Sequence, residues 1–360
     1  MIITTNTKEL LTPLLKLQGA IASNPVLPIL ENFLFEIGGG KLKISATDLE
    51  VWMTMEIPLM TDGELKVAIP AKIIVDTLKA YPNQPLKMDF SEEGKCKLKA
   101  NRSKKSFAVE IGEDFPQRPQ SDGENSIMDG EVLLTHLTKC APFVSTDSLR
   151  PSLCGVHFAL NGSMKTVATD AHQLSLVESE YEGIETNFIL PIKGVKLLQN
   201  NLKGVEVSFT KTRSHAIFEN GGMFMAIQLV DARFPDYNAV IPEDNPIVAK
   251  LSKHDLTGAL KRTLTYCNKT TNQGIFHFSE GELKITAQDL DFSNESEEII
   301  SCECNEELRI GFNVKFAIKE LDSMEEDEVF LNMSTPSRAA ILTNGNEGDI
   351  RLLMPVMLSN

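Results

Sequence analysis

The sequence predicts an α+β protein of three tandem homologous domains, each with two helices packed on antiparallel sheets. Two observations predict this. First, the segments ATDLE (46–50), ATDAH (168–172) and AQDLD (287–291) recur about 120 residues apart in the 360-residue chain. Second, helical and strand-like patterns alternate in the same order within each repeat. A period of this length indicates whole domains rather than the short units of a solenoid.

The three predicted domains span residues 1–118, 126–242 and 246–360. Further landmarks keep the period, including Phe-Pro at 115–116 and 234–235 and Met-Pro at 354–355. The segments between the domains are polar and contain proline, which is typical of linkers. The chain is also longer than the roughly 250–300 residues at which a single core stops growing.

Six segments carry apolar residues at helical spacing, two in each domain. They are residues 7–18, 71–81, 132–144, 192–203, 254–266 and 313–324. At the start of the first segment, Asn6 and Glu9 resemble a capping box. Pro13 lies inside the same segment, and we expect it to kink or shorten that helix.

Between the helices, runs such as 41–46 and 106–111 alternate polar and apolar residues, which predicts strands with one buried face. The Gly-Gly-Gly-Lys run at 38–41 lacks the spacing of a phosphate-binding loop and predicts a hairpin turn. We therefore expect antiparallel sheets that are covered on one side by the helices.

Charge is distributed unevenly along a chain whose net charge is −15. The six predicted helices contain twelve Lys and Arg against five Asp and Glu, so the remainder of the chain is strongly acidic. Lysine suits any solvated helix face, which is the simpler explanation for each single lysine. Six basic helices in one acidic protein instead predict a shared positive surface, with the negative charge on the sheet side. Such a surface contacts phosphates without reading bases.

Other classes of protein are disfavoured. No segment approaches the roughly 18 apolar residues of a membrane span. The N-terminus lacks the basic and apolar parts of a signal peptide, so we expect a cytoplasmic protein. The six cysteines form no Cys-x-x-Cys motif, which indicates buried free thiols. We find no catalytic motif, and expect no catalytic residue, metal or cofactor.

Asp48, Asp170 and Asp289 lie at matching positions of the three repeats. One alternative function is therefore a metal-dependent enzyme that uses these carboxylates. Equivalent positions in tandem domains need not converge, however, and aspartates commonly stabilise turns through backbone N–H groups. We expect a turn role for all three.

Several segments resemble the bacterial DNA polymerase sliding clamps, or β subunits: LPIL (27–30), VATDAHQL (167–174), LVDARFPDY (229–237), GFNV (311–314) and Met-Pro at 354–355. The resemblance extends over essentially the whole chain. It implies a homodimer whose two subunits close head to tail into a ring around double-stranded DNA, with the helices lining the hole. It also implies a processivity factor, not an enzyme, whose partners are the replicative polymerase, a clamp loader and other clamp-binding replication and repair proteins.

The resemblance further implies a cleft for partner peptides between the second and third domains. The matching positions are Leu153, Thr169, His172, Gln173, Leu174, Pro235, Val240, Asn313, Phe316, Met354, Pro355, Val356 and Met357. An apolar cleft with methionine walls suits several related peptides. The chain departs from the family at Gln173, Ala239 and Phe316, where the family often has Arg, a basic residue and Tyr, so peptide preference is expected to differ in detail.

Two more sets of residues follow from the helix charges and the resemblance. Those expected to face DNA are Asn24, Lys72, Lys79, Lys139, Arg150, Lys193, Lys196, Lys261 and Lys315. Asn24 stands where the family usually has Arg, which puts that contact in doubt. Those expected at the subunit interface are Lys104, Lys105, Phe107 and Val109 against Thr265, Tyr266, Glu295, Glu297 and Glu298. Basic flanks opposite acidic flanks favour register more than affinity.

A second alternative remains open at this point. A scaffold that binds peptides without enclosing DNA would share the cleft and much of the resemblance. Retention on circular DNA distinguishes the two, because only a closed ring is held there by topology.

Overall fold

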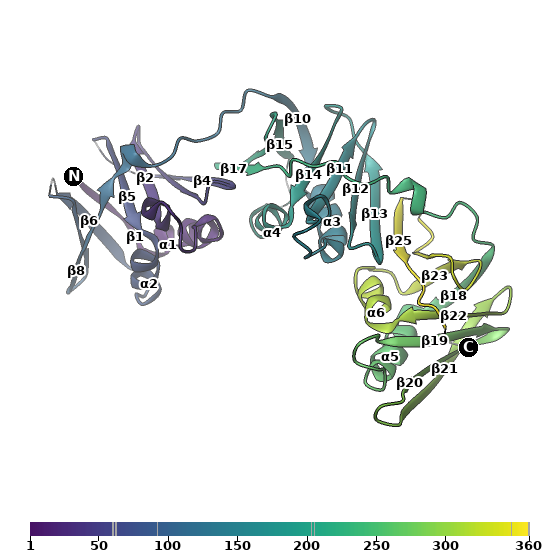
Figure 1. Ribbon diagram of the computed structural model, residues 1–360. Helices are drawn as coiled ribbons and strands as arrows, with labels where there is room; N and C mark the ends of the chain where they lie inside the picture. Colours follow the sequence, from purple (N-terminus) through teal and green to yellow (C-terminus); the bar gives the residue numbers. More distant parts are fainter. Residues whose placement is uncertain are drawn as a thin grey trace. The chain divides into compact units, whose positions relative to one another are not determined.

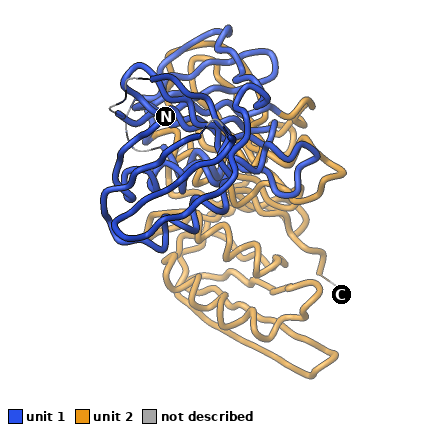
Figure 2. Tube along the Cα trace, turned by 90° about the vertical axis from the view of Figure 1, so that its left-hand side faces the viewer, with its two compact units in different colours: residues 1–131, 196–229 blue, residues 132–195, 230–360 orange. Residues whose placement is uncertain are grey.

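The computed structural model describes residues 1–358 apart from 60, 62, 92, 203, 205 and 347. Lys203, in the fourth predicted helix, lies outside the described residues. The chain forms two compact units (Figure 2). Unit 1 comprises Met1–Glu131 and Lys196–Leu229, and unit 2 comprises Val132–Val195 and Val230–Asn360.

Unit 1 contains two antiparallel sheets and the paired helices α1 (Thr7–Leu17) and α2 (Ala71–Lys79) (Figure 1). Among its described residues, a four-stranded sheet has the order β1 (Ile2–Asn6), β6 (Pro85–Ser91), β7 (Lys95–Ala100), β8 (Ser103–Ala108). A nine-stranded sheet has the order β10 (Glu124–Asp129), β15 (Glu206–Lys211), β16 (His215–Asn220), β17 (Met223–Gln228), β4 (Val51–Pro58), β3 (Lys41–Thr47), β2 (Asn32–Gly38), β5 (Leu65–Pro70), β9 (Glu110–Ile111).

Unit 2 is built on one antiparallel sheet of twelve described strands. Their order is β14 (Thr186–Pro191), β11 (Gly155–Leu160), β12 (Ser163–Thr169), β13 (Gln173–Glu180), β25 (Asp349–Leu353), β24 (Ala340–Thr343), β23 (Glu328–Met333), β18 (Ile247–Ser252), β21 (Asn294–Cys304), β20 (Gly281–Asp289), β19 (Gln273–Ser279), β22 (Leu308–Asn313). Helices α5 (Lys253–Leu264) and α6 (Val314–Asp322) pair with each other. Helices α3 (Gly130–Cys140) and α4 (Ile192–Asn201) contain residues of both units.

The helices lie where the apolar periodicity predicts them, with ends that differ by a few residues. Helix α2 shows the reason: it buries Ile74, Val75 and Leu78 along one stripe and exposes Lys72 and Lys79 on the other side. A stripe of this kind is stable only when it packs on a core. The prediction of an α+β fold on antiparallel sheets is confirmed.

The start of α1 differs from the prediction. Asn6 is the N-cap residue, but its side chain makes no capping hydrogen bond, so the predicted capping box is wrong. The Glu9 carboxylate instead accepts a bond from the Thr5 hydroxyl at 3.4 Å. Pro13 does not end the helix, which continues to Leu17, because the ring is buried on the apolar face and only one backbone donor is lost.

Strand pairing does not stop at the predicted domain linkers. In unit 1, β4 pairs with β17, and Met53 lies opposite Met225. In unit 2, β13 pairs with β25, and Leu174 lies opposite Leu352. Each pairing joins strands from consecutive predicted domains by backbone hydrogen bonds, which fix the register of the side chains on both faces.

The first two repeats form the same turn. Asp48 Oδ1 accepts bonds from the backbone N–H groups two and three residues later, at 3.1 and 2.8 Å, and Asp170 Oδ1 does the same at 3.0 and 2.9 Å. The next residues, Leu49 and Ala171, have positive φ values of 78° and 76°. Asp289 ends β20 and accepts the N–H two residues later at 3.2 Å. The expected turn role of these aspartates is confirmed.

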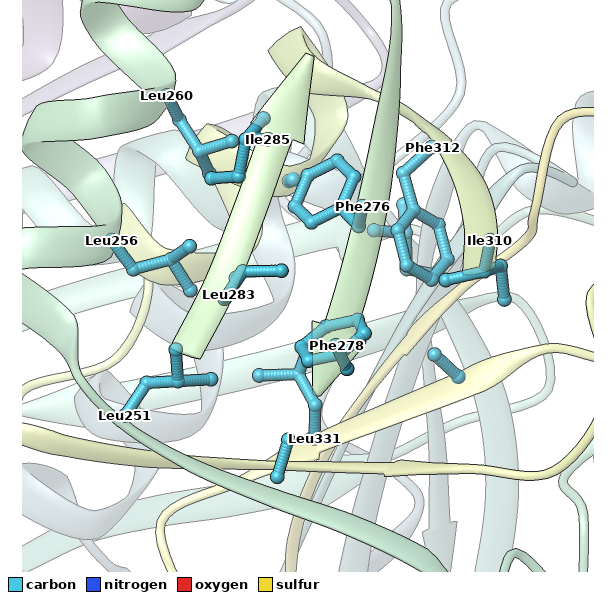
Figure 3. Close-up of a cluster of buried hydrophobic side chains, with 14 of the residues drawn as sticks. Leu251, Leu256, Leu260, Phe276, Phe278, Leu283, Ile285, Ile310, Phe312 and Leu331 are labelled. Carbon is cyan, nitrogen blue, oxygen red and sulfur yellow. The ribbon is translucent and has the colours of Figure 1, made fainter. Parts of the chain in front are cut away.

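Figure 3 shows the core of the last repeat. Leu256 and Leu260 of α5 lie on the same side as Ile285 of β20, while Phe276 and Phe312 lie on the far side of that strand. The two phenyl rings meet edge to face, with centroids 5.2 Å apart. Because this stripe of α5 is buried in the core, the charged residues of the helix lie on its remaining surface.

Two smaller expectations have mixed outcomes. Cys96, Cys140, Cys267 and Cys302 are buried free thiols as expected, but Cys154 and Cys304 are only half-buried. The glycine run forms the predicted β2–β3 hairpin turn, with positive φ at residues 39 and 40. No helix among the described residues is long and apolar enough to cross a membrane.

His136 predicts a loss of stability in mild acid. Its ring is buried beside the Thr166 hydroxyl, with 2.9 Å between Nδ1 and Oγ1, and burial lowers the pKa of His136 from 6.5 to about 4. The unfolded chain binds the proton more readily. The free energy of unfolding should therefore fall as the pH drops from about 6.5 to about 4, by up to about 3 kcal/mol.

Urea unfolding at pH 7.5 and pH 5 measures this effect. His136→Gln should lose less stability between the two pH values than the wild type does. An equal loss in both proteins would show that His136 does not titrate as expected.

Candidate functional site

Unit 2 contains a cavity of about 250 Å³. Its lining consists of Leu153, Thr169, Ala171, His172, Gln173, Leu174, Pro235, Asp236, Tyr237, Val240, Leu352 and Met354. Eight of these were expected from the sequence, and Ala171, Asp236, Tyr237 and Leu352 were not. The other expected residues, Asn313, Phe316, Pro355, Val356 and Met357, are not part of the lining.

The cavity is apolar in its depth and at its rim. Leu174 and Leu352 are 2% exposed and face each other across the β13–β25 pair, and with Leu153 they belong to one buried cluster. At the rim, Val240 is 53% exposed and Met354 is 40% exposed. The cavity can therefore take up apolar side chains of a ligand, with gain from removing both surfaces from water.

His172 connects the cavity to α6. Its backbone carbonyl accepts a bond from the Met354 N–H at 3.0 Å. Its ring stacks on Phe316, with centroids 5.8 Å apart and planes inclined by 26°. Phe316 thus contacts a wall of the cavity from behind and does not line it.

The last residues of the chain take a path beside β22. The Val356 N–H donates to the Gly311 carbonyl at 2.8 Å, and the Gln273 side-chain amide donates to the Met357 carbonyl at 3.3 Å. The Met357 side chain is 76% exposed. These bonds explain why the residues after Met354 lie outside the cavity.

Gln173 has a second role that its sequence position does not reveal. It is 1% exposed, and its Nε2 donates to the Phe316 carbonyl and to Glu320 Oε1, both at 3.0 Å. Its Oε1 accepts a bond from Lys319 Nζ at 2.9 Å. A neutral amide thereby satisfies groups of α6 from the end of β13, on the wall of the cavity.

Glu320 lies in the middle of this contact. The carboxyl is fully buried, its Oε2 has no hydrogen-bond partner among the described residues, and burial raises its pKa well above the usual value. Position 320 lies on the buried stripe of α6 with Ala317 and Leu321. A charged residue on a predicted apolar stripe was the available signal, and the sequence analysis missed it.

A second buried charge lies nearby on β25. Arg351 is fully buried, its Nε donates to Ser323 Oγ at 2.9 Å, and its guanidinium pairs with Asp349 at 2.5 Å. Asp349 also pairs with Lys139 Nζ at 2.6 Å. Removing one member of such a network would leave a buried charge unpaired, which is costly.

The residues expected to face DNA fall into two groups. Asn24, Lys72, Lys79, Lys196 and Lys315 are exposed. The others are engaged or partly covered: Lys139 in the ion pair described above, Arg150 with Asp147 at 2.9 Å, Lys261 with Asp322 at 3.6 Å, and Lys193 half-buried, which lowers its pKa. Lys139, with a side chain only 13% exposed, departs most from the expectation.

The residues expected at a subunit interface lie on two edge strands. β8 is the last strand of the four-stranded sheet. β21 pairs with β18 only at residues 303 and 304, which leaves the rest of that edge unpaired among the described residues. Glu298 is held by Arg262 of α5 at 2.7 Å, whereas Glu297, one residue earlier and on the other face, pairs with Lys284 of β20 at 2.6 Å. The acidic residues are thus divided between the two faces of the strand.

The chain matches family models over nearly its whole length. Residues 1–119 match the N-terminal domain, 128–236 the central domain and 238–357 the C-terminal domain of the DNA polymerase III beta subunit.

Curated relatives and solved structures agree with these matches. The beta sliding clamp of Haemophilus influenzae is 26% identical over 98% of both chains, and that of Pseudomonas putida is 28% identical over 98% of both. The sliding clamp of Pseudomonas aeruginosa, solved bound to griselimycin, is 26% identical. It superposes with a TM-score of 0.95 over 99% of this chain and 100% of that one.

Proposed function

This chain belongs to the DNA polymerase III beta subunit family, and we infer that it is a sliding clamp. Two copies form a ring that encircles double-stranded DNA and tethers the replicative polymerase to it. The observation that carries this function is the succession of three domain models in order over the whole chain. The protein is an accessory processivity factor, not an enzyme.

A clamp must hold DNA without stopping at particular sequences. Contacts to base edges would trap it, whereas lysines that meet phosphates give an attraction that is the same at every position. We propose that the exposed helix residues Lys72, Lys79, Lys196 and Lys315 supply it. Lys139, Arg150 and Lys261 have carboxylate partners within the chain and are proposed to contribute less. Enclosure, rather than affinity, then keeps the protein on DNA.

We propose that the cavity of unit 2 takes short peptides of the polymerase, the clamp loader and other clamp-binding proteins. Its apolar floor and the flexible Met354 at its rim suit related but different side chains. Gln173, at the place where the family often has Arg, carries no charge to attract an acidic peptide. Peptides of this chain's partners are therefore proposed to rely on apolar contacts.

We propose that the subunits join through β8 of one copy and β21 of the other. Both strands have an unpaired edge, and a strand edge offers backbone groups for a second sheet. Lys105 lies opposite the buried Leu98 and so shares the core-facing side of its strand, while Lys104 lies on the other side. Glu298 and Glu297 are divided in the same way, so each basic face meets an acidic one.

The remaining expectations belong to the same proposal. The three domains are proposed to span 1–118, 126–242 and 246–360, and the protein is proposed to act in the cytoplasm. The carboxylate enzyme is not favoured, because the repeated aspartates are used by turns. A peptide-binding scaffold that does not enclose DNA is not favoured, because the family is defined by the clamp.

The function predicts that the protein is held on DNA by topology. After loading by its clamp loader onto a nicked circular duplex, it should stay bound during gel filtration at moderate salt. It should leave when a restriction enzyme linearises the circle. Protein that stays bound to linear DNA with free ends would contradict enclosure.

Met354→Ala should weaken binding of a polymerase peptide about tenfold, because a buried methionine contact contributes about 1–2 kcal/mol. Met357→Ala is the matched control, since it removes the same side chain three residues later and outside the cavity. Fluorescence anisotropy with a labelled peptide measures both. Equal losses in the two variants would show that the cavity is not the peptide site.

Lys104→Glu should weaken the dimer at least tenfold, because it places like charges opposite each other. Adding Glu295→Lys should restore part of the affinity, and Glu295 suits this test because its described partner is the neutral Gln288 amide. Analytical ultracentrifugation at micromolar concentration measures the masses. If Lys104→Glu alone remains fully dimeric, the assignment of this interface is wrong.

A further inference from the structure

The four-stranded sheet of unit 1 has an unexpectedly basic face. The strand register places five lysines on one side of β6, β7 and β8: Lys87, Lys95, Lys97, Lys99 and Lys104. All five are exposed, and the alternating residues of the same strands, such as Met88 and Leu98, are buried on the opposite side. The expectation that the sheet side carries the negative charge is wrong for this sheet, which Figure 1 shows beside the N-terminus.

The lysines of this face are free of compensating charge. None of the five has an ion pair with a carboxylate among the described residues, and Asp89, opposite Lys97, is the one acid that the register places among them. Lys99 lies directly opposite both Lys87 and Lys104. Like charges in such positions destabilise a sheet. The face therefore retains a repulsive arrangement in a protein whose overall charge is −15.

The composition of the face favours phosphate over protein as its partner. Protein interfaces are depleted in lysine and depend on aromatic, arginine or large apolar anchors. Between the lysines, the register brings only small or polar residues of β6 to β8 to the surface, namely Asp89, Ser91, Ser106 and Ala108. Alternate residues of a strand lie about 6.7 Å apart, so Lys95, Lys97 and Lys99 form a row about 13 Å long. Such a row can meet several phosphates of one nucleic-acid backbone.

We propose that this lysine face is a second nucleic-acid contact, which binds the phosphate backbone without reading sequence and is separate from the helix lysines. It lies on a sheet, so it can hold DNA that does not pass through the ring. A clamp with such a face holds one duplex by enclosure and a second segment by charge. The second attachment is weak, reversible and strongly dependent on salt.

Covalently closed circular DNA tests the proposal. It has no end to thread through a ring, so binding to it in the absence of clamp loader measures outer surfaces alone. The full-length protein should bind closed circles at low salt in a gel-shift or sedimentation assay. The variant Lys95→Gln/Lys97→Gln/Lys99→Gln should bind at least tenfold more weakly. Its slope of log affinity against log salt should be shallower by about 2–3 units.

A matched control separates this face from net charge. The variant Lys41→Gln/Lys43→Gln/Lys165→Gln removes three exposed sheet lysines that pair with Glu56 and Glu178. It changes the net charge equally and should bind closed circles like the wild type. Equal losses in both variants, or no binding of closed circles by the wild type at low salt, would overturn the proposal.

Two further readouts keep the result unambiguous. Loading of the β7 variant onto nicked circles, and its release on linearisation, should be unchanged, so failure of this proposal is distinct from failure of the clamp function. The thermal midpoint of the variant should be equal to or higher than that of the wild type, because repulsion is removed. Tighter binding of poly-glutamate than of DNA of equal charge would identify an acidic protein as the occupant and overturn the proposal.

Discussion

The antiparallel pairing of β13 with β25 is the interaction on which the candidate peptide site depends. It brings a strand of the second repeat and a strand of the third, separated by some 170 residues of chain, into one backbone register. Leu174 and Leu352 then become cross-strand neighbours that form the cavity floor. The same register buries Arg351 and places Gln173 against α6. The site is therefore a product of domain joining, since neither strand provides it alone.

Periodicity predicts much of this fold because burial enforces it. A helix such as α2 must turn the stripe of Ile74, Val75 and Leu78 toward a core, and that requirement is written in the residue spacing. The repeated aspartates are predictable for a similar local reason, since a carboxylate two or three residues before free N–H groups stabilises a turn. The N-terminus of α1 was not predictable in this way, because Thr5 competes for Glu9 and the capping bond is absent.

Features that depend on distant residues were predicted poorly. The ion pair between Lys139 and Asp349 joins positions far apart in the sequence, so a count of helix lysines could not identify Lys139 as engaged. The cavity lining was predicted for eight residues through family resemblance, but Tyr237 and Leu352 entered it only through the fold. Strand register was likewise needed to divide lysines 95, 97 and 99 from the buried residues between them. Sequence reasoning treated all sheets as one surface, whereas the charge alternates from one face of a strand to the other.

The duplicated turn has a consequence for how a binding site arises. Four residues after the turn aspartate, the second repeat has Leu174 at the cavity, while the first repeat has Trp52. Trp52 is 4% exposed, meets Phe115 edge to face at 5.7 Å and donates its ring N–H to Thr54. The bulky indole occupies with its own atoms the place that a shorter side chain leaves to a guest. Gene duplication thus supplies equivalent sockets, and the size of one residue decides which socket is plugged from within and which stays vacant for another protein.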